Sequence, residues 1–181
     1  MAERQAREED ISMVSLLTLE IITGFTRPVF QLSEDATCLV DSGADTPVWT
    51  QGAERLMDTF GENRIQKVEG KNFLLSGFGK GYEVVDVYII KDLELKDMKD
   101  GGTDRVVFKN LTIACTSRPT MIADLILPAT AFSHMNYKVC NIGVEYPVVE
   151  IEHDKEEYYV NPIYRLDNDD FVERVYSFSN E

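Results

Sequence analysis

Apolar and polar residues alternate along this chain in short stretches, and this two-residue period favours β-strands over helices. Segments rich in β-branched and aromatic residues occupy residues 15–24, 27–32 and 38–40, and polar or glycine-containing turns separate them. Short strands at such close spacing are typical of an all-β body rather than of alternating strands and helices. We therefore expect a mostly β fold.

Later segments extend this strand pattern. Residues 72–76 and 82–90 are apolar runs joined by the glycine-rich sequence SGFGKG, which predicts a β-hairpin. Residues 105–115 alternate imperfectly and should form a further strand, and residues 137–154 a closing pair of strands. The charged stretch at residues 91–105 contains a Gly-Gly turn and is expected to be an exposed excursion between strands.

Short helices are predicted where the apolar period changes. The first helix has apolar residues at positions i, i+3, i+4 and i+7, which form one face: Ala53, Leu56, Met57 and Phe60. Gly61 can end this helix. Pro128 follows an apolar strand and suits the first turn of a second short helix, because that turn needs no N–H donor. Residues 167–178 (DNDDFVERVYSF) could form a third, amphipathic helix.

Length and charge limit the classes of function. A chain of 181 residues with 44% hydrophobic content can form one cored domain, which we place at residues 11–152. Residues 1–10 then form a charged N-terminal tail, and residues 153–181 an acidic C-terminal extension. The formal net charge of -14 argues against partners that carry phosphate, so we expect neither nucleic-acid binding nor membrane docking.

The cysteines and the first residues indicate the compartment. Cys38, Cys115 and Cys140 lie in apolar stretches without metal-type spacing, which favours buried free thiols. The sequence begins with charged residues and lacks an apolar signal core, and it contains no apolar run long enough to cross a bilayer. We therefore expect the protein to reside in a reducing cytoplasm.

The segment CLVDSGADTPVW places the carboxylate of Asp41 directly after an apolar run and before Ser42 and Gly43. The simpler interpretation is an Asx-turn, in which the side chain only caps the bend. The catalytic interpretation brings two such loops together, so that two carboxylates about 3 Å apart share one proton and hold a water molecule. The chain contains no second Asp-Ser-Gly or Asp-Thr-Gly. A twofold axis would therefore have to supply the second loop, and catalysis would require a homodimer.

These features together resemble the retropepsin-like aspartic peptidases, the family of the retroviral proteases, and particularly its bacterial members. The matching segments occur in order: LVDSGAD at residues 39–45, SGFGKG at 76–81, and DLILPATAF at 124–132. The resemblance implies a closed, mostly β barrel with short helices and one lobe per chain. It further implies an aspartic endopeptidase that acts on peptides or proteins as a symmetric homodimer, without a metal or a cofactor.

The resemblance also implies roles for individual residues. Asp41 would be the catalytic aspartate, Ser42 would brace the two active-site loops, and Gly43 would let them approach closely. The residues that would contact the substrate are Ala44, Asp45, Gly77, Phe78 and Gly79, of which the last three would form the tip of a flap over the peptide. In one departure from the retroviral pattern, Pro128 and Ala129 stand where those relatives usually have Gly and often Arg.

Two alternatives remain open from the sequence. The fold could be a non-catalytic module for dimerisation or peptide binding, or a latent enzyme that its own extension from Lys155 onward holds inactive. His134 and His153 have no partner at catalytic or metal-type spacing and are expected to be surface or packing residues. Trp49, the only tryptophan, is expected in the core beneath the Asp41 loop.

Overall fold

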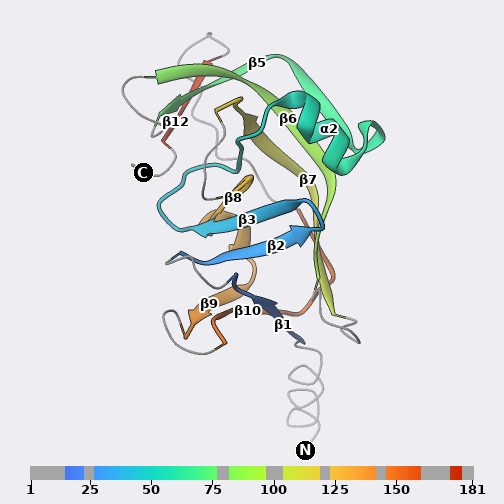
Figure 1. Cartoon of the computed structure of the whole chain (residues 1–181). Helices are drawn as coiled ribbons and strands as arrows, with labels where there is room; N and C mark the ends of the chain where they lie inside the picture. The colour runs from blue at the N-terminus through green and yellow to red at the C-terminus, as the bar shows by residue number, and fades with distance from the viewer. Residues whose placement is uncertain are drawn as a thin grey trace, which may run out of the picture.

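The computed structural model describes residues 15–22, 27–76, 82–96, 104–118, 123–141 and 146–159, and the strand backbone of residues 172–176. These residues are mostly β-strand, as the sequence predicted (Figure 1). The strands are β1 (Ser15–Glu20), β2 (Val29–Ser33), β3 (Ala36–Asp41), β4 (Val48–Trp49), β5 (Ile65–Ser76), β6 (Tyr82–Lys96), β7 (Arg105–Cys115), β8 (Leu125–Pro128), β9 (Asn136–Cys140), β10 (Val148–His153), β11 (Glu157–Tyr159) and β12 (Val172–Tyr176). The helical elements are α2 (Ala53–Phe60) and the 3₁₀ helices η1 (Glu62–Arg64) and η2 (Ala129–Phe132).

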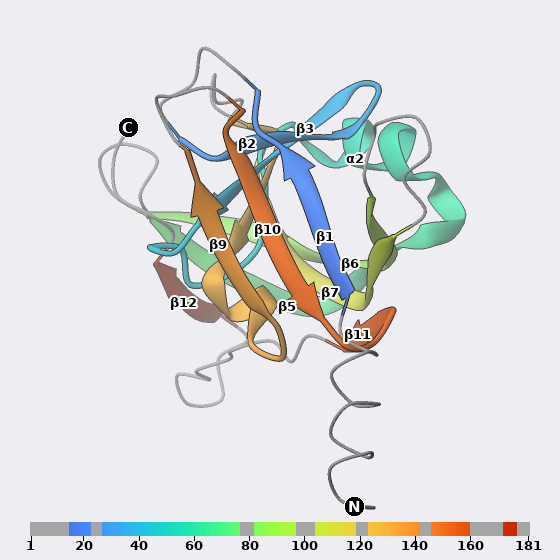
Figure 2. The same ribbon diagram turned by 90° about the horizontal axis from the view of Figure 1, so that it is seen from below.

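The strands pair into two sheets. The larger sheet has the order β12-β5-β6-β7-β4-β8-β3-β2, with β11 pairing onto β7, and the smaller has the order β1-β10-β9 (Figures 1 and 2). An isolated bridge between Ile21 and Phe30 links β1 to β2. The described strands form no closed barrel, because β12 and β2, the end strands of the larger sheet, do not pair with each other, and only this bridge pairs one sheet with the other.

Aromatic residues fill the main hydrophobic core. Trp49 is fully buried and contacts Phe60 edge-on with ring centroids 5.6 Å apart, which confirms its predicted core position. Phe108 of β7 contacts Phe132 of η2 in the same way at 5.7 Å. Edge-to-face contacts of this kind add to the gain from burying apolar area, so they hold α2 and η2 against the sheet.

The predictions of the first helix and of the β-hairpin, which rest on local sequence patterns, are confirmed. The predicted helix spans Ala53–Phe60, buries Leu56 and Phe60, and ends at Gly61 with φ of 89°, which glycine adopts readily. The predicted hairpin is β5–β6, with Ser76 opposite Tyr82 at the last described pair before its tip. The tip, including Gly77, Phe78 and Gly79, lies outside the described residues.

The prediction of an exposed excursion after β6 is wrong for residues 91–96. These residues continue β6 in register with β7, and Leu93 and Leu95 are 1% exposed while the charged residues between them face outward. A strand with one buried face accepts charges at every second position, and this alternation identifies it better than its total charge does. Residues 97–103 lie outside the described residues.

The imperfect alternation in β7 has a backbone cause. Val106 and Phe108 belong to the same buried cluster as Leu111 and Ile113, so the inward positions change from even to odd numbers within one strand. Asn110 lies at the change and has φ of 53°. Asparagine tolerates this left-handed conformation better than most residues, so one residue shifts the phase of the strand.

The predicted helix at residues 167–178 is wrong for Val172–Tyr176. This segment is β12, and it pairs in parallel with β5. Its Val-Glu-Arg-Val-Tyr sequence suits a strand as well as one and a half turns of helix, so pairing with a sheet edge decides the structure.

The three cysteines are free, and they differ in burial. Burial raises the pKa of the Cys38 thiol well above its usual value, and burial together with the nearby Asp86 raises the pKa of Cys115 to about 12. Cys140 of β9 is only half-buried. The thiolate is the reactive form of cysteine, so burial and a raised pKa both protect Cys38 and Cys115 from thiol reagents.

We predict that a maleimide at pH 8 labels Cys140 at least about 100-fold faster than Cys38 or Cys115 in the folded protein. Mass spectrometry of proteolytic fragments gives the rate at each site, and labelling in denaturant provides the control. Equal rates at the three thiols in the folded protein would contradict the placement of β3 and β7 in the core.

Candidate functional site

Asp41 lies at the end of a buried parallel strand pair. β3 runs parallel to β8, and the register sets Asp41 beside Pro128. The preceding β3 residues Cys38, Leu39 and Val40 are at most 5% exposed, whereas Asp41 itself is half-buried. The buried residues of β3 therefore place the Asp41 carboxylate at the edge of the core.

Hydrogen bonds at the other end of the pair fix this register. The backbone N–H of Thr37 donates to Oδ2 of Asp124 at 2.9 Å, and the N–H of Asp124 lies 3.3 Å from Oγ1 of Thr37. The buried Thr50, directly after β4, donates its N–H to the Asp124 carbonyl at 2.9 Å. Because one residue anchors both neighbours of β8, a slip of β3 against β8 would break several bonds at once.

The DSGAD loop closes on the carboxylate that precedes it. Oδ1 of Asp41 accepts the Gly43 N–H at 2.9 Å, and the Asp41 carbonyl accepts the Ala44 N–H at 3.1 Å. The first bond is the Asx-turn that the simpler interpretation predicted, and the second closes a β-turn over the same residues, so one carboxylate oxygen has a structural role.

The second carboxylate oxygen differs from the first. Oδ2 of Asp41 is shielded from solvent and accepts no hydrogen bond from the described residues. A shielded polar oxygen without a partner costs about 1–3 kcal/mol, and more when it is charged. The turn alone therefore does not account for Asp41, because a Ser would cap the bend without a second polar atom at this position.

A pocket of about 430 Å³ opens at this carboxylate. Asp41, Ser42 and Gly43 line it, and the last two are exposed, so the structure brings together the three residues predicted to form the catalytic loop. The remaining lining residues come from the segment before β2, from β3 and from β9: Arg27, Pro28, Leu39, Val40, Tyr137 and Val139.

The predicted substrate-contacting residues are only partly at this pocket. Ala44 is 5% exposed and belongs to a second apolar cluster that includes Leu75 and Val85 from the hairpin arms. Asp45 is exposed and, like Ala44, is absent from the pocket lining. Gly77, Phe78 and Gly79 are outside the part of the chain that the structure describes.

Sequence analysis missed Arg27, Tyr137 and Val139. Arg27 precedes β2, where a hydrogen bond from the Val29 N–H to the Arg27 carbonyl bends the chain, so no strand pattern in the sequence indicates that it reaches the pocket. No local pattern indicates Tyr137 or Val139, because β9 meets β3 only through the packing of the two sheets.

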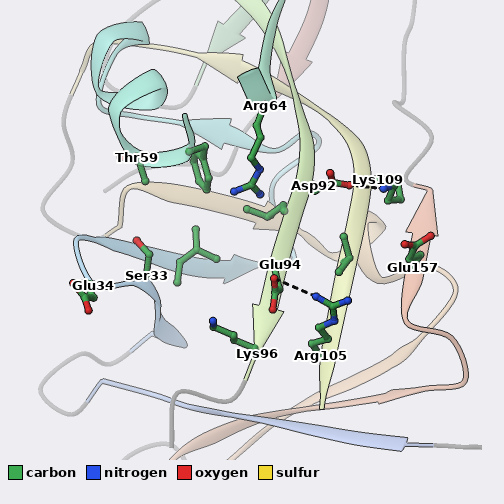
Figure 3. Close-up of a pocket in the computed structure, with 14 residues that line it drawn as sticks. Ser33, Glu34, Thr59, Arg64, Asp92, Glu94, Lys96, Arg105, Lys109 and Glu157 are labelled. Carbon is green, nitrogen blue, oxygen red and sulfur yellow. Dashed lines mark ion pairs between the residues drawn. The ribbon is translucent and has the colours of Figure 1, made fainter. Parts of the chain in front are cut away.

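A second pocket, of about 560 Å³, lies away from Asp41 between α2, β6, β7 and β11 (Figure 3). Lys109 pairs with Asp92 at 2.5 Å, and Arg105 with Glu94 at 3.6 Å. The hydrogen bond between Lys109 and Asp92 raises the pKa of the lysine and lowers that of the aspartate. Two of its acids, Asp92 and Glu94, are therefore held by cations as ion pairs, which makes these two carboxylates less suited to acid–base chemistry.

The histidines do not contribute to the Asp41 pocket. His153 is buried, with Nε2 3.0 Å from Asp104 Oδ2 and Nδ1 2.7 Å from the Lys155 carbonyl oxygen, so it connects β10 to the residue before β7 as a packing residue. His134 lines a separate shallow pocket.

The described residues contain neither a metal-binding cluster nor a membrane-spanning helix. Across these residues, no group of three or more His, Cys, Asp or Glu side chains is placed to hold a metal ion. Among the helices described, none has the length and apolar character needed to cross a bilayer.

Comparison with known proteins found no matching family model, no similar curated protein and no similar solved structure.

The anchoring role of Asp124 leads to a stability prediction. We expect Asp124→Ala to lower the free energy of unfolding by about 1–2 kcal/mol, because it leaves the Thr37 N–H without its acceptor. Asp124→Asn is the matched control, since its amide oxygen can still accept that bond. Urea denaturation measures both losses. A loss for the Ala variant no larger than that for the Asn variant would contradict the anchor.

Proposed function

We propose that this chain is one lobe of a retropepsin-like aspartic endopeptidase, active as a symmetric homodimer. The observation that carries the proposal is the state of Asp41: Oδ1 is held by the Gly43 N–H, while Oδ2 is shielded and has no partner among the described residues. A second Asp41 carboxylate and a water molecule across a twofold axis would give Oδ2 the partners that the single chain does not supply, and the atoms that shield Oδ2 would have to move as the two loops dock.

The chemistry of such a pair needs no other ionisable group. The two carboxylates share one proton, and the ionised member takes a proton from the water as the water oxygen attacks the peptide carbonyl carbon. The protonated member donates a hydrogen bond to the oxyanion that forms on the carbonyl oxygen. Collapse of this tetrahedral intermediate breaks the C–N bond, and the leaving nitrogen receives the proton that the first carboxylate took.

The loop residues support this geometry in the proposal. The Gly43 N–H fixes the rotation of the Asp41 carboxylate, and the absence of a side chain at Gly43 lets a second loop approach. Ser42 is exposed beside Asp41 and can donate a hydrogen bond across the axis. The peptide would lie extended between this loop and the β5–β6 hairpin, with Gly77, Phe78 and Gly79 as the flap tip and Ala44 and Asp45 contacting the substrate.

The alternative function is a non-catalytic or latent module of the same fold, used for dimerisation or peptide binding. The Asx-turn at Gly43 favours it, because this bond would hold the loop whether or not chemistry occurs. The three free cysteines fit a reducing cytoplasm under either function.

We predict that Asp41→Asn lowers the rate of peptide hydrolysis by at least about 10²- to 10⁴-fold, because no ionised carboxylate remains to take the proton from water. The amide oxygen can still accept the Gly43 N–H, so the fold is retained. Asp58→Asn makes the same chemical change at an exposed position on α2 and should leave the rate unaltered. Hydrolysis of a fluorogenic peptide library measures both rates, and activity that survives Asp41→Asn would remove the catalytic proposal.

Mixing variants tests whether one site needs two chains. After subunit exchange, an equal amount of added Asp41→Asn chains leaves about half of the wild-type chains in fully wild-type dimers, so the rate should fall by about half. Added Asp58→Asn chains should instead raise the total rate. A rate that stays constant as Asp41→Asn chains are added, with exchange verified by mass spectrometry, would mean that each chain acts alone.

A further inference from the structure

The C-terminal extension reaches the hairpin that the proposed function uses as a flap. β12 pairs in parallel with β5 from Val172 beside Asn72 to Tyr176 beside Ser76 (Figure 1). These β5 residues are the last part of the hairpin arm before SGFGKG, and they pair with β6 on their other side. β12 therefore covers the outer edge of the arm along its final five residues.

The same extension is fixed to the body of the molecule before it reaches the hairpin. β11 pairs in parallel with β7, and the Val107 N–H donates to the Glu156 carbonyl at 2.7 Å. The hydroxyl of the buried Tyr158 accepts the N–H groups of Asp154 and Lys155 at 3.1 and 3.0 Å. One part of the extension is thus held on the central strand β7, and another part is hydrogen-bonded to the hairpin arm.

This arrangement restricts how the arm can move. The part of the hairpin beyond Asn72 and Asp86 has only two described strands apart from β12, because the pairing of β6 with β7 begins at Asp86. A two-stranded ribbon is marginally stable, and a third strand stabilises it. While β12 is paired with β5, an outward movement of the arm must either carry β12 with it or break the pairing of Val172–Tyr176 with β5.

We propose that β12 is an intramolecular restraint that holds the hairpin arm down and keeps the Asp41 site latent until the strand detaches. The effect on activity rests on the proposed function, but the restraint on the arm does not. The strand is suited to detach, since it is short, has a single neighbour among the described strands, and pairs in parallel, which is slightly weaker per residue than antiparallel pairing. A peptide strand that adds to the same β5 edge could displace it.

A proline scan of residues 172–176 in the full-length chain tests the restraint. In a parallel strand with one neighbour, only every second residue directs its N–H to that neighbour, and proline removes the N–H. Proline should therefore release the arm at alternating positions. Ser179→Pro, beyond the paired register, is the control, and circular dichroism verifies the fold of each variant.

Two readouts separate the restraint from the chemistry. Amide hydrogen exchange at residues 72–76 should become faster for the alternating set of proline variants only, and peptide hydrolysis should rise in the same variants by a factor of about 5 to 100, the usual range for coupled sites. Unchanged exchange, or equal effects at all five positions, would overturn the restraint whatever the rates are.

The remaining outcomes are also decisive. Alternating exchange with hydrolysis equal to that of the wild type would overturn the latency while leaving β12 as a structural strand. Alternating exchange without hydrolysis by any form of the chain, at concentrations where dimers are present, would support the restraint and count against the peptidase.

Discussion

The parallel pairing of β3 with β8 is the constraint on which the candidate site depends. Hydrogen bonds between Thr37 and Asp124 fix the pair at its start, and the buried residues between transmit that register to Asp41 at its end. Because strands are stiff and their side chains alternate with a strict period, a slip of one residue would turn the carboxylate from the pocket into the core. The position of one functional group is thus set by bonds at the opposite end of its strand.

The unsatisfied oxygen of the Asp41 carboxylate links the candidate site to the proposed homodimer. One oxygen of Asp41 is satisfied within its own loop and the other is shielded without a partner among the described residues. Single chains usually avoid such groups. A symmetric contact between two loops that uncovers this oxygen would replace the missing hydrogen bond with one shared between the two carboxylates. The fold of the chain and its oligomeric state would then depend on each other.

The sequence predicted features that depend on a few neighbouring residues. The face of α2, the arms of the β5–β6 hairpin and the turn at Asp41 each follow from residues close together in the chain. It did not predict features that depend on which edge a strand meets. The sequence predicts an excursion at residues 91–96 because their charge masks the alternation of a strand. It predicts a helix over Val172–Tyr176 because the β5 edge that pairs with them is about 100 residues away along the chain.

The same distinction applies to the site. Asp41, Ser42 and Gly43 lie in one pocket because they are consecutive, while Tyr137 and Val139 reach it only through the packing of one sheet against the other. The expected barrel failed for a related reason. Local alternation predicts strands and their faces, but closure depends on the pairing of the outermost strands, and here β12 and β2, at the two ends of the larger sheet, do not pair.

The most direct test of the central claim is the separation of the Asp41 carboxylates in a crystal structure of the assembled protein. The account predicts a twofold axis through the two DSGAD loops, with carboxylate oxygens about 3 Å apart, the separation at which two acids share a proton. Dimers that place the two carboxylates beyond the reach of a single bridging water, or a chain that crystallises and sediments only as a monomer, would contradict it.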